Sequence, residues 1–146
     1  EKDKGIFVLV KTSNPSSGEL QDQMIADNTV YRTMGDMCEQ WGEDTRGAHG
    51  YSAVGAVVGA TYPAQLGELR QALPHTMFLV PGYGAQGGGA KDVAPAFDKR
   101  GLGAIINSSR AIMCAYKKGE WKEEDYAAAA RAEAIRMRDE IAAALK

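Results

Sequence analysis

The sequence predicts an α/β fold made of four βα units. Four short apolar runs have the length of strands, at residues 6–10, 54–60, 77–80 and 102–107. Runs without polar alternation are typical of parallel strands that are buried on both faces. Each run is followed by a segment with helical features, and this alternation predicts parallel strands joined by right-handed crossovers. Two architectures fit: a four-stranded doubly wound sheet, or four consecutive units of a (β/α)₈ TIM barrel.

The helices are predicted from periodicity and from their expected ends. The first has apolar residues at three- and four-residue spacing from Val30 to Trp41, with Asp27 or Asn28 as its N-cap. The second begins at Pro63 and ends before Pro74. A short third helix around 93–97 is closed by Gly101, and a long fourth begins near Glu123. Its expected apolar stripe contains Tyr126, Ala130, Ala134, Met137, Ile141 and Leu145.

Length and composition indicate one domain of an ordinary globular protein. The 146 residues are 45% hydrophobic and 25% charged, and the net charge of −2 gives no field that would attract nucleic acid or an anionic membrane. No signal peptide is visible, and no apolar run reaches the roughly 18 residues of a membrane helix. Cys38 and Cys114 lack metal-ligand spacing, so we expect reduced, buried thiols in a cytoplasmic protein. A start at Glu1, directly before a strand, suggests the interior of a longer protein.

A glycine-rich segment follows the third strand, at residues 81–89. It contains five glycines within eight residues, after Pro81. Glycine lets backbone N–H groups approach an anion closely, and a strand that leads through such a loop into a helix suits phosphate. A flexible surface loop explains the composition equally well.

Polar side chains follow the other strands as well. Arg110 comes after the fourth strand, where a guanidinium could bind a phosphate dianion or pair with a nearby carboxylate. Gln86 could contact a phosphate and a pyrimidine edge together, or be an exposed loop residue. Ser13 could hydrogen-bond a ligand, although spacing alone favours a turn before Pro15. Lys11 is at a position where barrels can form a Schiff base, but a lysine that snorkels to the surface or is paired with a carboxylate is the favoured interpretation.

Other classes of site lack support in the sequence. His49 and His75 are far apart and no His, Cys and carboxylate cluster indicates a metal. The motif of a serine hydrolase does not occur. The acidic run 123–125 fits the first turn of a helix, where carboxylates interact favourably with the helix dipole.

Four motifs occur in an order and spacing that resemble a known family. They are Val10-Lys11-Thr12-Ser13-Asn14-Pro15, Val58-Gly59-Ala60-Thr61, the run from Val80 to Gly88, and Asn107-Ser108-Ser109-Arg110. Together they resemble the carboxyl-terminal half of orotidine 5′-phosphate decarboxylases of the longer bacterial subfamily, from about Ile6 to Tyr116.

The resemblance implies strands five to eight of a TIM barrel, so that residues 1–146 form an incomplete domain. It implies phosphate contacts from Gln86 on a closing loop and from Arg110, with the backbone of Ser109 beside it. It implies that Ser13 touches the pyrimidine and bridges to that glutamine. Pro81, Gly82 and Gly87 belong to the same substrate-binding loop.

The resemblance also sets a limit on the chemistry. The family's catalytic Asp-x-Lys-x-x-Asp motif and its preceding lysine do not occur here, and Lys11 matches neither lysine. We therefore expect no catalytic residue in this chain, which would hold substrate for the conversion of orotidine 5′-monophosphate to UMP in pyrimidine biosynthesis. The resemblance implies no metal or organic cofactor, a missing N-terminal half-barrel as partner, and a homodimer. By itself the chain is expected to be inactive.

Two alternatives stay open. The first is another phosphate-binding TIM-barrel enzyme, such as a sugar-phosphate decarboxylase or epimerase. The second is a non-catalytic nucleotide-binding fragment.

Overall fold

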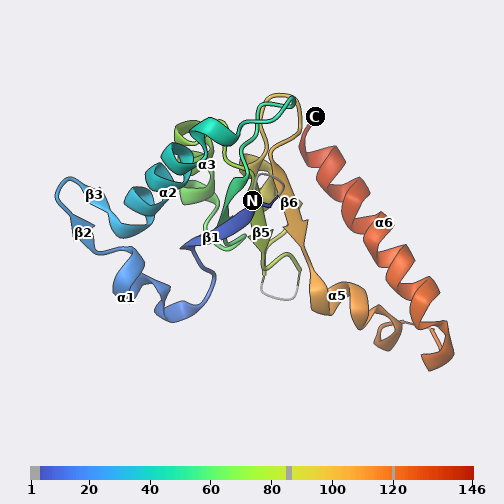
Figure 1. Cartoon of the computed structure of the whole chain (residues 1–146). Helices are drawn as coiled ribbons and strands as arrows, with labels where there is room; N and C mark the ends of the chain where they lie inside the picture. Colours follow the sequence, from blue (N-terminus) through green and yellow to red (C-terminus); the bar gives the residue numbers. More distant parts are fainter. Residues whose placement is uncertain (1–3, 85–86, 120) are drawn as a thin grey trace.

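A four-stranded parallel sheet forms the centre of the molecule (Figure 1). The structure is a computed structural model that describes residues 4–84, 87–119 and 121–146. The strands are β1 (Ile6–Lys11), β4 (Val54–Val58), β5 (Phe78–Pro81) and β6 (Ala104–Asn107). Their order in the sheet is β1-β4-β5-β6. This order follows the chain without the reversal that defines a doubly wound sheet, so that alternative was wrong.

Helices and a small hairpin connect the strands. The helices are α1 (Gly18–Gln21), α2 (Val30–Trp41), α3 (Pro63–Ala72), α4 (Ala90–Val93), α5 (Ser109–Met113) and α6 (Tyr126–Ala144). The hairpin pairs β2 (Met24–Ile25) with β3 (Asn28–Thr29). Three of the four predicted helices are confirmed, whereas α1, α5 and the hairpin were not predicted. The bounds of the short third helix were wrong: α4 begins at Ala90, a 3-10 turn over Ala94–Ala96 follows it, and Gly101 lies in a separate turn in which its N–H donates to the carbonyl of Asp98. None of the described helices combines the length and apolarity needed to cross a bilayer.

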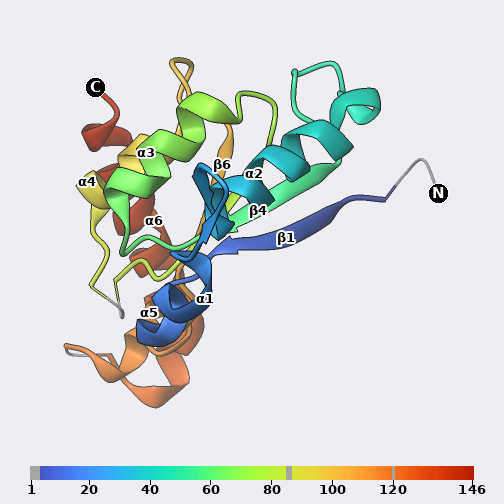
Figure 2. The same ribbon diagram turned by 90° about the vertical axis from the view of Figure 1, so that its left-hand side faces the viewer.

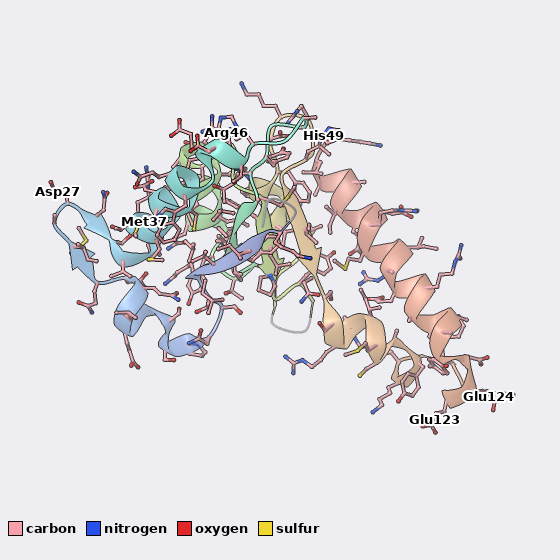
Figure 3. All side chains as sticks on the ribbon, viewed as in Figure 1. Asp27, Met37, Arg46, His49, Glu123 and Glu124 are labelled. Carbon is pink, nitrogen blue, oxygen red and sulfur yellow. The ribbon has the colours of Figure 1, made fainter. Side chains whose placement is uncertain are left out.

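The N-cap predicted for α2 was wrong. Asn28 pairs with Ile25 in the hairpin, and Asp27 lies at its tip (Figure 3). Thr29 caps the helix instead, and its side chain accepts a hydrogen bond from the backbone N–H of Arg32 at 3.3 Å. The hairpin thus delivers a threonine to the position that the isolated sequence assigned to its neighbours.

The helices pack against one face of the sheet. Alternate strand residues on that face, such as Val10, Ala56, Phe78 and Val80, share one apolar core with residues of α2, α3, α4 and α6. Figure 2 shows α2 and α3 beside each other on this side of the strands.

The other face of the sheet is partly uncovered. Leu9 is 64% exposed, Ile105 51% and Phe7 44%. The expectation that every strand is buried on both faces was therefore wrong for β1 and β6, the two edges of the sheet. The expected stripe of α6 was also only partly correct. Met137 and Ile141 are buried, but Tyr126, Ala134 and Leu145 are exposed because α6 runs along the β6 edge and no described element covers its other side.

Candidate functional site

A cavity of about 230 Å³ opens where β5 and β6 end. The two strands pair in parallel up to Pro81 and Asn107, so the loops that follow them start side by side. The cavity is lined by Pro81, Gly82, Tyr83, Asn107, Ser108, Ser109 and Arg110. Four of the predicted site residues, two from each loop, thus come together.

The glycine loop has a defined backbone in its described part. Gly82, Gly84 and Gly87 have φ values of 101°, 77° and 96°, a region that side chains disfavour. The N–H of Gly84 donates to the carbonyl of Gly88 at 2.8 Å. A Cβ on Gly88 would lie 2.7 Å from the Cβ of Ala60, so the loop packs tightly on the chain after β4. Gln86 lies outside the described residues.

Tyr83 and Ser108 hold the loop in place, and sequence reasoning missed both. The hydroxyl of Ser108 donates to the carbonyl of Tyr83 at 2.9 Å, joining the loop to the start of α5. The phenol of Tyr83 donates to Glu140 of α6 at 2.9 Å. Burial, together with this hydrogen bond to a carboxylate, raises the pKa of Tyr83 to about 12. Tyr83 therefore stays protonated and neutral under physiological conditions.

Arg110 lies on the first turn of α5 with its side chain exposed. Within residues 4–84, 87–119 and 121–146, no carboxylate pairs with it, whereas Arg32, Arg100 and Arg136 all form ion pairs. The alternative of a carboxylate-paired Arg110 is therefore not supported among these residues. A guanidinium without a protein anion beside it, next to the N–H groups of a helix's first turn, suits a phosphate.

Ser13 lies at the same end of the sheet but is not among the residues that line the cavity. It follows β1, which is separated from β5 by β4. A Cβ on Gly59 would lie 2.9 Å from the Cβ of Ser13, so only glycine lets the two segments approach this closely. The N–H of Gly59 donates to the carbonyl of Lys11 at 2.7 Å. The structure thus has a cavity with an arginine and, two strands away, a separately anchored serine.

Comparison with known proteins identifies the family. Residues 1–124 match the family described as Orotidine 5'-phosphate decarboxylase / HUMPS family. The chain belongs to this family. An orotidine 5'-phosphate decarboxylase of Rhodopirellula baltica is 49% identical over 141 residues, which are 94% of this chain and 47% of the relative. One from Clostridium perfringens is 45% identical over 146 residues, or 99% of this chain and 50% of the relative.

Solved structures of the family have a similar fold over nearly the whole of this chain. The OMP decarboxylase of Leishmania donovani superposes with a TM-score of 0.74 at 34% identity, over 99% of this chain and 49% of that protein. The chain spans about half the length of the curated relatives it matches.

The two histidines and the acidic residues before α6 lie away from the cavity. The side chain of His75 is within 2.9 Å of the carbonyl of Gly50, and Figure 3 shows His49 at the end of the molecule opposite the glycine loop. Glu123 and Glu124 lie in the turn before α6, which confirms their helix-start role (Figure 3). The described residues contain no group of three or more His, Cys, Asp or Glu side chains that could hold a metal ion.

Lys11 is paired with a carboxylate, which was one of the two possibilities that the sequence favoured, and it does not snorkel to the surface. Its ammonium group is buried and lies 2.7 Å from a carboxylate oxygen of Asp22. Because its ammonium group forms an ion pair with Asp22, the geometry does not support a role for Lys11 as a nucleophile.

Proposed function

We propose that this chain is the substrate-holding half of an orotidine 5′-phosphate decarboxylase, which converts orotidine 5′-monophosphate to UMP. The observation that carries the proposal is the cavity between the ends of β5 and β6, with Arg110, which forms no ion pair among the described residues, at its wall. The guanidinium, the N–H groups of the glycine loop and the first turn of α5 are donors suited to a phosphate dianion. Gln86, which the structure does not describe, would add a contact from the same loop, with Gly87 beside it.

Ser13 would contact the pyrimidine. The phosphate of a nucleotide bound in the cavity would leave its base directed toward the ends of β4 and β1. Gly59 allows Ser13 to lie close to the end of β4. This placement supports separate phosphate and base subsites within one strand-end surface.

We propose that residues 1–146 form half of a (β/α)₈ barrel, its fifth to eighth units. Support comes from the sequential strand order, the helices on one face, and the exposed Phe7, Leu9 and Ile105 on the other. An apolar groove of about 440 Å³ between β6 and α6 contains Ile106, Met137 and other apolar side chains. Both edges and the groove would be covered by the remaining half of the barrel.

The chemical step would depend on that remaining half. Loss of CO₂ leaves a carbanion at C6 of the pyrimidine, which requires a proton donor and charges arranged around the departing carboxylate. The cavity offers Arg110 and the neutral Tyr83 phenol, which is held by Glu140. Neither is placed at the base subsite, so this chain would supply binding energy from the phosphate while the other half supplies the acid. The mechanism proposed requires neither metal nor organic cofactor.

The full-length protein tests this function directly. It should decarboxylate orotidine 5′-monophosphate, a reaction that can be monitored by the loss of the substrate's orotate absorbance. It should also bind UMP more tightly than ribose 5-phosphate. Equal affinity for ribose 5-phosphate without decarboxylation would instead favour a sugar-phosphate decarboxylase or epimerase, and UMP binding without turnover would favour a nucleotide-binding module. The 146-residue chain alone should show no turnover, and measurable activity would refute the proposed division.

We also propose a homodimer in the cytoplasm. The homodimer rests on the resemblance to the family, because the exposed apolar residues at the sheet edges are assigned to contact with the other half-barrel. The two cysteines are free thiols, which fits a reducing compartment. Burial raises the pKa of Cys38 to about 11, whereas Cys114 is only partly buried, so the expectation of two buried thiols was wrong for Cys114. Mass measurement of the full-length protein in solution tests the dimer.

A further inference from the structure

A fully buried lysine lies two residues before Ser13. The side chain of Lys11 has 0% exposure, and its ammonium group lies 2.7 Å from the Asp22 carboxylate. The faces of two tyrosine rings complete its surroundings, with ring centres 4.5 Å (Tyr62) and 5.7 Å (Tyr31) from the nitrogen. Because a buried charge without a partner is very unfavourable, the lysine holds Asp22 and the chain around it at this place.

A second contact ties the same segment one residue further on. The backbone N–H of Thr12 donates to the side-chain oxygen of Gln21 at 3.0 Å. The amide nitrogen of Gln21 donates in return to the Thr12 hydroxyl at 3.1 Å. Residues 11–22 thus form a closed loop whose two ends are joined by the Lys11–Asp22 ion pair and by the reciprocal hydrogen bonds of Thr12 and Gln21. Ser13 lies inside this loop.

The middle of the loop is anchored as well. The hydroxyls of Ser17 and Tyr62 lie 3.1 Å apart. Tyr62 also faces the Lys11 ammonium, so one tyrosine contacts both the loop and its ion pair. Tight packing against Gly59 limits the position of Ser13 from the β4 side.

We propose that Lys11–Asp22 and Thr12–Gln21 are positioning pairs, which hold Ser13 for the base of a bound nucleotide. This inference rests on the proposed function. A buried ion pair contributes little net stability, because apolar side chains of similar volume in its place often stabilise a protein equally well. Its geometric precision is the property that a hydrogen bond from Ser13 requires, because small displacements abolish such contacts.

Asp22→Asn in the full-length protein tests the inference. The Asp22 side chain is half exposed, so the substitution removes the charge with little change of volume. UMP affinity, measured by calorimetry, should fall about ten-fold, the value of roughly one hydrogen bond. Affinity for ribose 5-phosphate, which has no base, should not change. Asp22→Glu should restore most of the UMP affinity. Equal loss for both ligands would overturn the inference.

A double-mutant cycle with Ser13→Ala separates positioning from a general structural effect. If the ion pair acts through Ser13, Asp22→Asn should cause no further loss of UMP affinity in the Ser13→Ala background. Additive losses would overturn the inference. Gln21→Ala, which removes the second contact, should behave as Asp22→Asn does, and it provides the same test should the first variant fail to fold.

Asp36→Asn is the matched control. Asp36 accepts from Arg32 at 2.9 Å in another ion pair, on α2, and its side chain is similarly exposed. This variant should bind both ligands as the unmodified protein does, and a selective loss of UMP affinity would overturn the inference. A different result would refute the proposed function itself, namely that the unmodified protein does not bind UMP. Tight UMP binding combined with an additive cycle would refute the positioning role alone.

Discussion

Replacing Arg110 with alanine removes the one guanidinium at the wall of the cavity between β5 and β6. A bidentate contact with phosphate comprises two charge-assisted hydrogen bonds, each contributing about 1.5–3 kcal/mol. Because the side chain is exposed in the structure, water screens it and the lower value applies to each bond. The expected loss of transition-state stabilisation is therefore about 3 kcal/mol, or roughly a hundred-fold in kcat/KM.

The assay is steady-state decarboxylation of orotidine 5′-monophosphate by the full-length protein, together with the Kd for UMP. Arg110→Lys keeps the charge without the planar fork and should recover only part of the loss. Arg131→Ala provides a matched control, since Arg131 is an exposed arginine of α6 with no ion pair among the described residues. An unchanged kcat/KM in Arg110→Ala, or an equal loss in Arg131→Ala, would refute the assignment of Arg110 to phosphate.

Three further predictions concern stability and the shape of the site. Gly59→Ala should cost about 1–3 kcal/mol in chemical denaturation and weaken UMP binding, because its Cβ would lie 2.9 Å from that of Ser13; an unaltered midpoint would contradict the close packing. The pKa of Tyr83 is raised to about 12, so the contribution of this residue to the free energy of unfolding should be fully present below pH 10 and be lost as the pH rises from 10 to 12. Tyr83→Phe, which also loses the bond to Glu140, should lose about 1 kcal/mol at pH 7. Its alkaline fall should be smaller than that of the unmodified protein but not absent, because the pKa values of Tyr31 and Tyr51 are raised as well; an equal alkaline fall in the variant would contradict the assignment. Ala26→Gly should stabilise by about 0.5 kcal/mol, since Ala26 has φ 52°, and a lower Tm would count against strain there.

The four strands could be predicted because an apolar run bounded by turn residues is a local signal. The short elements could not. The hairpin has two residues in each strand and α5 has five residues, too few for any periodicity to show. The same limit explains the N-cap of α2, because the choice of Thr29 depends on the pairing of Asn28 with Ile25 in the hairpin.

Part of the site was predictable for a related reason. Pro81, Gly82, Ser109 and Arg110 follow strands directly, and parallel strands bring such loops to one edge. Tyr83 could not be found this way, because its role depends on Glu140, which is 57 residues further along the chain. Its only local feature is its place between glycines, which says nothing of a partner on α6.

The two subsites differ in how much of their surroundings this chain supplies, and the difference bears on specificity. The phosphate cavity is bounded by two adjacent strands of one sheet and is fixed by contacts within the chain, such as Ser108 to Tyr83. The proposed base subsite would have Ser13 beside a face of the sheet on which Leu9 is exposed. Enclosure of a pyrimidine there would draw on the proposed other half of the barrel. Under this proposal, phosphate recognition would belong to this half, whereas selection of the base and exclusion of water from C6 would depend on both halves together.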